Sequence, residues 1–174
     1  PNSIHDVKWI NYFVDKKMVN AYLLVRDRHW SAYDQSSRVI HATTLASVAD
    51  FSIARFYRTI ATAFRIRRII KKHRIDLINL HYAEPNALWC IFRKYFRVPM
   101  IITTLGTDVL VTIPNAFSSK SFINCLVAPA YKLAFNQADL ITSTSRGQME
   151  SVKRISGRDH GLASGRTGVS TSTT

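Results

Sequence analysis

The sequence predicts an α/β fold: a Rossmann-like, three-layer α/β/α arrangement around a mainly parallel sheet. Three short apolar runs, at 76–81, 99–104 and 139–144, have the length of buried strands. Polar residues and then a helical segment follow each run, and strands that alternate with helices form parallel sheets covered on both faces. The 174 residues, 47% of them hydrophobic, are enough for one domain with a core of its own.

Four elements are expected before the first of these runs. Apolar residues at helical spacing predict a helix over 4–17, and apolar runs predict strands within 18–26 and at 39–43. The clearest helix spans 50–74. Its apolar face is expected to consist of Ile53, Phe56, Tyr57, Ile60, Phe64 and Ile70.

Three helices are expected in the remainder. Pro85 suits the first turn of a helix over 85–96, because its missing N–H is not needed there. A helix lies within 115–137, where Pro129 marks a point at which it can break. Ser145 is expected to cap the last helix, with Gln148 in the reciprocal capping-box position.

The sequence therefore divides into a domain over 1–156 and a tail over 157–174. The tail holds four of the six glycines and a run of Ser and Thr, and nothing in it resembles a core. We expect it to be disordered, either as an ordinary flexible terminus or as an aberrant end.

The formal charge of +13 favours polyanions: nucleic acid, an anionic membrane face or phosphorylated substrates. No apolar run reaches the roughly 18 residues that span a bilayer. Cys90 and Cys125 are not clustered, so we expect buried free thiols and a reducing cytoplasm. No histidine has metal-ligand spacing, and we expect no metal site.

Polar residues follow three expected strands, at the edge where open α/β sheets bind ligands. Hydroxyls, carboxylates and backbone N–H groups together suit a ligand that bears sugar or phosphate, although each elbow has the alternative of a plain cap or turn. Asp108 could bind a ligand hydroxyl or cap the next segment, and His5, near a helix start, could contact a phosphate. The candidate site consists of His5, His81, Tyr82, Glu84, Gly106, Thr107, Asp108 and Ser145.

A second candidate surface is the helix 50–74, which contains no acidic residue between Asp50 and Asp76. Clustered cations beside aromatic residues favour an anionic membrane surface, while charge alone would also allow nucleic acid or a solvated outer face. We do not expect nucleic acid, because no reading module is present. The basic residues are Arg55, Arg58, Arg65, Arg67, Arg68, Lys71, Lys72 and Arg74.

Four segments occur in an order that resembles a known family: SIHDVKWINYF at 3–13, RIDLINLHYAEPNAL at 74–88, TTLGTDVLV at 103–111 and QADLITSTS at 137–145. They resemble the N-terminal half of GT-B glycosyltransferases of the glycosyltransferase-4 type, over about residues 2–156. The sequence contains no Walker loop, no G-x-G-x-x-G and no G-x-S-x-G motif. It therefore does not resemble the common nucleotide hydrolases, dinucleotide-binding enzymes or esterases.

The resemblance implies two Rossmann-like domains that face a cleft. The N-terminal domain would hold a lipid-linked or saccharide acceptor, and the C-terminal domain a nucleotide-sugar donor, with no metal or other cofactor. It also implies a cytoplasmic protein that meets the inner face of a membrane through its basic helix. The matching loop positions here are His5, the elbow from His81 to Glu84 and the turn from Gly106 to Asp108.

The chain departs from the family pattern in four places. The first strand is missing, Lys17 to Asn20 replaces a conventional turn, and Leu105 stands where many relatives have His. The donor domain is missing as well, so we expect the chain to be inactive alone. The alternative reading is a non-catalytic binding module with a basic face for membrane or nucleic acid.

Overall fold

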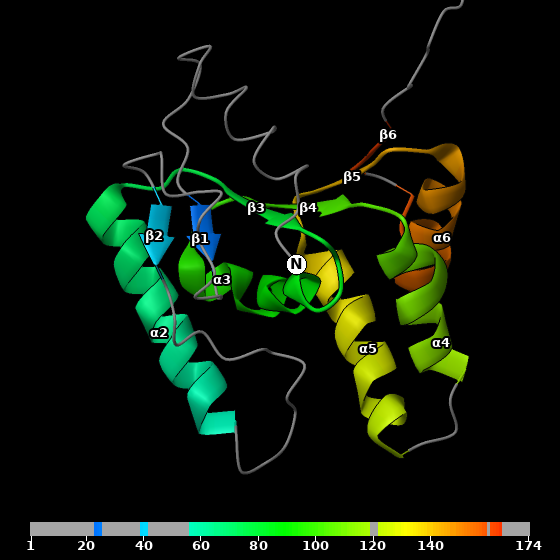
Figure 1. Cartoon of the computed structure of the whole chain (residues 1–174), viewed down its shortest axis with the longest axis horizontal. Coiled ribbons are helices and arrows are strands. Elements are labelled where there is room, and N and C mark those ends of the chain that lie inside the picture. The colour runs from blue at the N-terminus through cyan, green and yellow to red at the C-terminus, as the bar shows by residue number, and fades with distance from the viewer. Residues whose placement is uncertain (1–22, 26–38, 42–55, 119–121, 160, 165–174) are drawn as a thin grey trace, which may run out of the picture. The chain divides into compact units, whose positions relative to one another are not determined.

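The computed structural model describes residues 23–25, 39–41, 56–118, 122–159 and 161–164, drawn in colour in Figure 1. The chain forms two compact units, Pro1–Ala46 and Ser47–Thr174, which we describe separately.

The described residues of the first unit form two strands, β1 (Leu23–Val25) and β2 (Val39–His41), which pair in parallel. They confirm the strands expected within 18–26 and at 39–43, although both are three residues long. The helix expected over 4–17, with His5, lies outside the described residues.

The second unit is built on a four-stranded, all-parallel sheet in the order β3–β4–β5–β6. The register places His81 opposite Thr103 and Thr103 opposite Thr142, so the carboxyl ends of these strands share one edge. The mainly parallel α/β sheet predicted from the sequence is confirmed. The strands are β3 (Ile78–His81), β4 (Met100–Thr104), β5 (Leu140–Ser143) and β6 (Leu162–Ser164).

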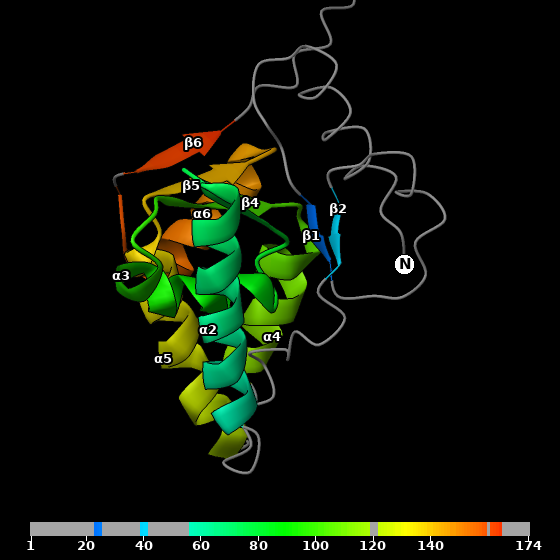
Figure 2. The same ribbon diagram turned by 90° about the vertical axis from the view of Figure 1, so that its left-hand side faces the viewer.

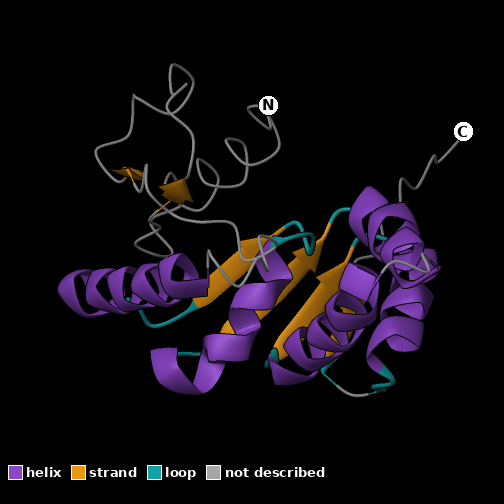
Figure 3. Ribbon diagram, turned by 90° about the horizontal axis from the view of Figure 1, so that it is seen from below, coloured by secondary structure: helices purple, strands orange, loops and turns teal. Residues whose placement is uncertain are grey.

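The helices of this unit lie on one face of the sheet (Figures 1 and 3). Each strand lies beside the strand before it, and right-handed crossovers in one direction bring every connecting helix to the same side. Met100, Ile102 and Thr104 of β4 are fully buried, as are Leu88 and Phe135 from the crossovers on either side. The core of the unit therefore lies between this face and the helices.

The opposite face of the sheet carries a row of polar side chains, and the described residues of this unit place no helix on it. Thr103 Oγ1 donates to Asn79 Oδ1 across 2.9 Å and lies 3.0 Å from Thr142 Oγ1. Cross-strand hydroxyl pairs of this kind stabilise a sheet and hold its register.

The helix expected over 50–74 is confirmed as α2 (Phe56–His73), which Figure 2 shows end to end. Its expected apolar face is wrong at two positions, because the Tyr57 and Phe64 side chains are 63% and 60% exposed. The buried positions hold small or aliphatic side chains, and the larger rings of Tyr57 and Phe64 turn outward. The buried residues are Thr59, Thr62, Ala63, Ile66 and Ile70.

Of the other expected helices, the one over 85–96 is more broken than the sequence predicts, whereas the one within 115–137 does not break at Pro129. The segment 85–96 is a 3-10 helix, η2 (Asn86–Phe92), followed by one turn, α3 (Arg93–Phe96), which ends at Arg97 with φ of 60°. A π-helical turn, η3 (Asp108–Thr112), leads into α4 (Ile113–Ser118), and α5 (Phe122–Gln137) continues through Pro129. None of the described helices is long and apolar enough to cross a membrane.

The boundary expected at residue 156 is wrong for the first part of the tail. Leu162–Ser164 pairs with β5 as a parallel strand, and Arg158 is buried. Its Nη1 donates to the backbone oxygens of Phe135 and Ala138 across 2.8 and 2.6 Å. A guanidinium can satisfy several carbonyl groups at a helix end, which composition alone does not reveal. Residues 165–174 lie outside the described residues.

Candidate functional site

The candidate site lies at the carboxyl edge of β3, β4 and β5, where three loops begin. Parallel pairing brings the first two loops together, because His81 stands opposite Thr103. The backbone N–H of Tyr82 then donates to Thr103 O across 3.1 Å, which extends the pairing one residue into the loop. The topology thus places the expected elbow residues of these strands side by side.

Asp108 ties the first two loops to each other. Its Oδ2 accepts from the backbone N–H of Ala83 at 2.7 Å, and its Oδ1 accepts from Gly106 and Val109 at 2.9 and 3.0 Å. The backbone N–H of Leu105 also donates to Oδ2, at 3.4 Å. Asp108 is only 2% exposed, and these four amide donors compensate for burying its charge. The sequence left open that Asp108 binds a ligand hydroxyl or caps the next segment. The structure shows instead that its carboxylate binds backbone N–H groups of both loops, and η3 has no side-chain cap.

Gly106 is held in a conformation that side chains rarely adopt, with φ of 119°. A Cβ atom here would also lie 3.1 Å from Nε2 of Gln148. The carbonyl oxygen of Gly106 accepts from the backbone N–H groups of Val109 and Leu110, which starts the π-helical turn. Glycine therefore allows both the turn and its close contact with α6 (Arg146–Ser156).

Gln148 joins the second loop to the third. Its Oε1 accepts from both N and Oγ1 of Thr144, at 3.2 and 3.1 Å, and from Thr104 Oγ1 at 3.4 Å. Ser145 caps α6 as expected, because its Oγ accepts from the backbone N–H of Gln148 at 3.3 Å. The reciprocal half of the expected capping box is wrong, since the Gln148 side chain binds Thr144 instead.

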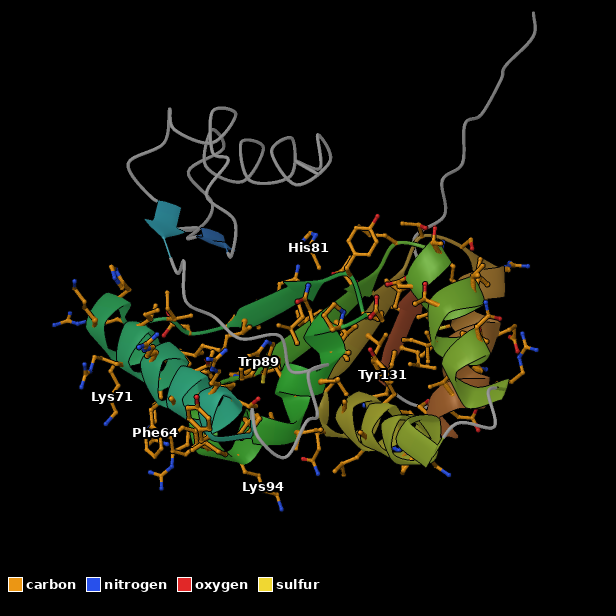
Figure 4. All side chains as sticks on the ribbon, turned by 60° about the horizontal axis from the view of Figure 1, so that its bottom comes forward. Phe64, Lys71, His81, Trp89, Lys94 and Tyr131 are labelled. Carbon is orange, nitrogen blue, oxygen red and sulfur yellow. The ribbon has the colours of Figure 1, made fainter. Side chains whose placement is uncertain are left out.

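Beneath these loops lies a buried phenol that the sequence did not single out. Tyr131 of α5 is 2% exposed (Figure 4). Burial raises the pKa of the Tyr131 hydroxyl, and the carboxylates of Glu84 and Asp108 raise it further. No short motif surrounds Tyr131, and its position on the buried side of α5 was the only signal in the sequence. Tyr131 therefore stays neutral.

Of the remaining expected residues, Glu84 is half-buried. The others that the structure describes lie on the outer side of the edge. Tyr82 is 42% exposed and has φ of 65°, and Thr107 and Ser145 are also exposed. His81 is half-buried, with Nε2 3.1 Å from Nδ2 of Asn79, and it lies on the side of the sheet away from α5. Its carbonyl oxygen accepts from Asn86 Nδ2 at 2.7 Å.

Two kinds of residue thus make up this edge. Asp108, Gly106 and Gln148 are buried and hold the three loops, whereas Tyr82, Thr107 and Ser145 leave hydroxyl groups open to solvent. A rigid backbone with outward hydroxyls is suited to a polar, hydroxyl-rich ligand. His5 lies outside the described residues, so the structure does not place it near this edge.

Comparison with known protein families gives a match over most of the chain. A family model described as glycosyl transferase 4-like matches residues 1–145. The match includes β3, β4 and β5 together with the Asp108 and Ser145 loops. No curated protein matches the chain.

Proposed function

Because the chain belongs to the glycosyl transferase 4-like family, we propose that it is the acceptor-side domain of a sugar-transferring enzyme. The donor of that enzyme is a nucleotide-sugar, and the acceptor is a lipid-linked or free saccharide. The free, buried thiol of Cys90 fits a reducing cytoplasm, where we place the reaction.

The observation that carries this proposal is the Asp108 tether at the strand ends. Four backbone amides donate to its carboxylate, so Asp108 is committed to shaping the loops. Recognition then falls to the exposed hydroxyls of Tyr82 and Thr107, which stand on the loops that Asp108 joins. Hydroxyl groups on fixed backbone are what a saccharide acceptor requires for orientation.

A donor needs more than this edge offers. The leaving nucleotide diphosphate develops negative charge, which cations or helix N-termini must stabilise in the transition state. Tyr82, Thr107 and Ser145, the exposed residues assigned to the edge, carry hydroxyl groups and no charge. The helix N-terminus at this edge, that of α6, is already capped by the Ser145 side chain. We therefore propose that the 174-residue chain binds acceptor and transfers no sugar by itself.

Saccharide binding tests the proposal. Methyl glycosides of common hexoses serve as acceptor probes and uridine- and guanosine-diphosphate sugars as donor probes, with binding followed by saturation-transfer NMR. We expect at least one glycoside to bind, and Tyr82→Ala to weaken it about fivefold, the effect of losing one hydrogen bond. Leu133→Ala, which alters an exposed side chain on α5, is the matched control and should leave binding unchanged.

Two results would overturn the proposal. The first is binding of a nucleotide-sugar that is tighter than that of any glycoside and equally dependent on Tyr82, which would make this edge the donor side. The second is sugar transfer above the rate of donor hydrolysis by the 174-residue chain alone.

A further inference from the structure

A row of polar side chains crosses the sheet on the face opposite its helices and ends at His81. Thr142, Thr103 and Asn79 stand on neighbouring strands, and hydrogen bonds join each to the next. The row continues along β3, where Asn79 Nδ2 lies 3.1 Å from Nε2 of the His81 ring. Thr103 is only 8% exposed, and at so buried a position an aliphatic side chain is the usual choice. A polar row at this place therefore points to a role beyond the pairing of the strands.

The hydrogen bonds of the row run in one direction. Thr103 Oγ1 donates to Asn79 Oδ1 at 2.9 Å, so the amide of Asn79 turns its Nδ2, which can only donate, toward His81. The opposite direction would require Thr142 to donate to the Ile102 carbonyl oxygen at 3.5 Å, whereas the Thr142 and Thr103 hydroxyls lie 3.0 Å apart. The shorter hydrogen bond is the better one, which favours the direction that leads to His81.

This direction decides which nitrogen of His81 carries the proton. Nε2 accepts from Asn79, and a neutral imidazole has one N–H, so the proton lies on Nδ1. His81 takes part in a further interaction, which does not alter the assignment, because Nε2 is already the acceptor. The backbone of His81 is held as well, since its carbonyl oxygen accepts from Asn86 Nδ2 at 2.7 Å. The ring at the end of β3 is therefore fixed in position and in tautomer.

We propose that His81 binds the saccharide acceptor as a neutral hydrogen-bond donor through Nδ1–H, and that Asn79 and Thr103 are positioning residues that fix this tautomer. A histidine at a strand end can also serve as a base, but here Nε2 is engaged and Nδ1 carries its proton. A polar network that locks the rotamer and proton of one side chain is the support that a binding group needs. This assignment rests on the proposed function, in which this edge binds a saccharide.

Nitrogen NMR of the histidine rings tests the tautomer without any ligand. The full 174-residue chain is prepared with isotope-labelled histidine, and the His81 signals are assigned by their loss in His81→Gln. Protonated and bare ring nitrogens have very different shifts. We expect a protonated Nδ1 and a bare Nε2 at about pH 8.5, roughly two units above the ordinary pKa of histidine. A protonated Nε2 in the parent chain would overturn the inference.

Variants of the row separate positioning from folding. Asn79→Asp places an acceptor opposite Nε2 and should move the ring proton to that nitrogen. Thr103→Val removes the hydroxyl that orients the Asn79 amide and should give a mixture of both tautomers. Thr103→Ser keeps the hydroxyl and should keep the parent tautomer. Urea denaturation measures the stability of each variant separately, because a less stable sheet does not by itself move a proton between ring nitrogens.

Glycoside binding then connects the tautomer to the acceptor. The probes are the methyl glycosides of common hexoses, and their affinity should fall with the share of the Nδ1–H form. We expect a loss of about twofold for an even mixture in Thr103→Val, and of about tenfold in Asn79→Asp if a tenth of that form remains. Thr103→Ser should bind like the parent chain.

The outcomes distinguish this inference from the proposed function. A parent chain that binds no glycoside contradicts the proposed function, and the recognition role of His81 fails with it. If the parent binds a glycoside and Asn79→Asp reverses the tautomer without lowering the affinity, only the role of His81 is wrong. A tautomer that stays the same in both Asn79→Asp and Thr103→Val would show that these residues do not position the ring.

Discussion

The carboxylate of Asp108 accepts a hydrogen bond from the backbone N–H of Ala83 across 2.7 Å, although 25 residues separate the two in the chain. The same carboxylate binds the N–H groups of Gly106 and Val109. Both loops at the ends of β3 and β4 therefore take their shape from one buried charge. Substitution of Asp108 should therefore lower the stability of the protein before it has any direct effect on ligand binding.

Asp108→Asn should lower the free energy of unfolding by about 2–3 kcal/mol, as expected for losing charged hydrogen bonds in a buried place. The amide of asparagine has a single acceptor oxygen, so one or more of the four backbone donors loses its partner. Urea denaturation followed by circular dichroism measures the change. Thr107→Ser, an exposed neighbour, should stay within about 0.5 kcal/mol of the parent. An equally small effect of Asp108→Asn would contradict the tether.

Two glycines at this edge should respond to alanine in opposite directions. Gly106→Ala places a Cβ at φ of 119° and 3.1 Å from Gln148 Nε2, and should destabilise the protein by roughly 1–3 kcal/mol. Gly147 lies in α6, where a Cβ atom would meet nothing within 4 Å, and Gly147→Ala should stabilise by about 0.5 kcal/mol. Thermal melts of the two variants measure these changes. Melting temperatures that shift in the same direction in both variants would contradict the prediction.

Acid should weaken a contact that joins η2 and α3 to the start of β5. Arg93 donates to both oxygens of Asp139 at 2.7 and 2.8 Å, and Met100 N–H donates to Oδ2 at 2.8 Å. The Arg93 hydrogen bond, aided by that of Met100, holds the pKa of Asp139 below its ordinary value of 3.8. Because the folded pKa is the lower one, this contribution to stability is complete above pH 3.8 and is lost as the pH falls through the folded pKa.

Arg93→Gln should therefore raise the pKa of Asp139 toward 3.8, which carboxyl-carbon NMR can follow. It should also make the free energy of unfolding less dependent on pH below that value. Lys153→Gln is the control. Lys153 Nζ lies 3.6 Å from Oδ1 of Asp159, whose side chain is 89% exposed, so this ion pair should add little to the free energy of unfolding. If the pKa of Asp139 is the same in the parent and in Arg93→Gln, the contact between Arg93 and Asp139 does not form in solution.

Arg158→Ala should destabilise the second unit by about 2–3 kcal/mol, since the carbonyl groups of Phe135 and Ala138 lose their buried donor. Arg154→Ala, an exposed neighbour on α6, should change the free energy of unfolding by less than about 0.5 kcal/mol. Hydrogen exchange offers a second measurement: in Arg158→Ala the last turn of α5 should exchange faster than in the parent. Equal exchange there would count against the capping role.

The apolar pattern predicted β3, β4 and β5 because each is a short apolar run followed by polar residues and a helical segment. The runs are not apolar throughout, since Asn79, Thr103 and Thr142 form the polar face of the sheet. Local chemistry predicted the Ser145 cap, which depends on a few neighbouring residues. Which side chains of α2 face the core could not be predicted from such a pattern. Its buried positions include Thr59 and Thr62, and only packing against the rest of the unit explains why small polar residues face inward while Phe64 faces out.

The sequence predicted where the residues of the candidate site lie, but not which hydrogen bonds they form. Sequence placed Gly106 and Asp108 at a strand end, but the partners of the Asp108 carboxylate come from backbone groups, which every residue has. Gln148 was expected to complete a cap, and it turned to Thr144 and Thr104 because the neighbouring strand brought those hydroxyls within reach. Arg158 was hidden for a similar reason, since its acceptors are carbonyl groups of α5 and the residue after it.

The spatial order of β3, β4, β5 and β6 is also the order in which a ribosome makes them. Every new strand finds its neighbour already synthesised, and none has to be inserted between two that are paired. Assembly can therefore proceed by addition at one side, with modest loop closures at each step. Of these elements, β6 and Arg158 are made last. The carbonyl groups at the C-terminal end of α5 therefore gain the Arg158 guanidinium as a donor only after β3, β4 and β5 have been synthesised.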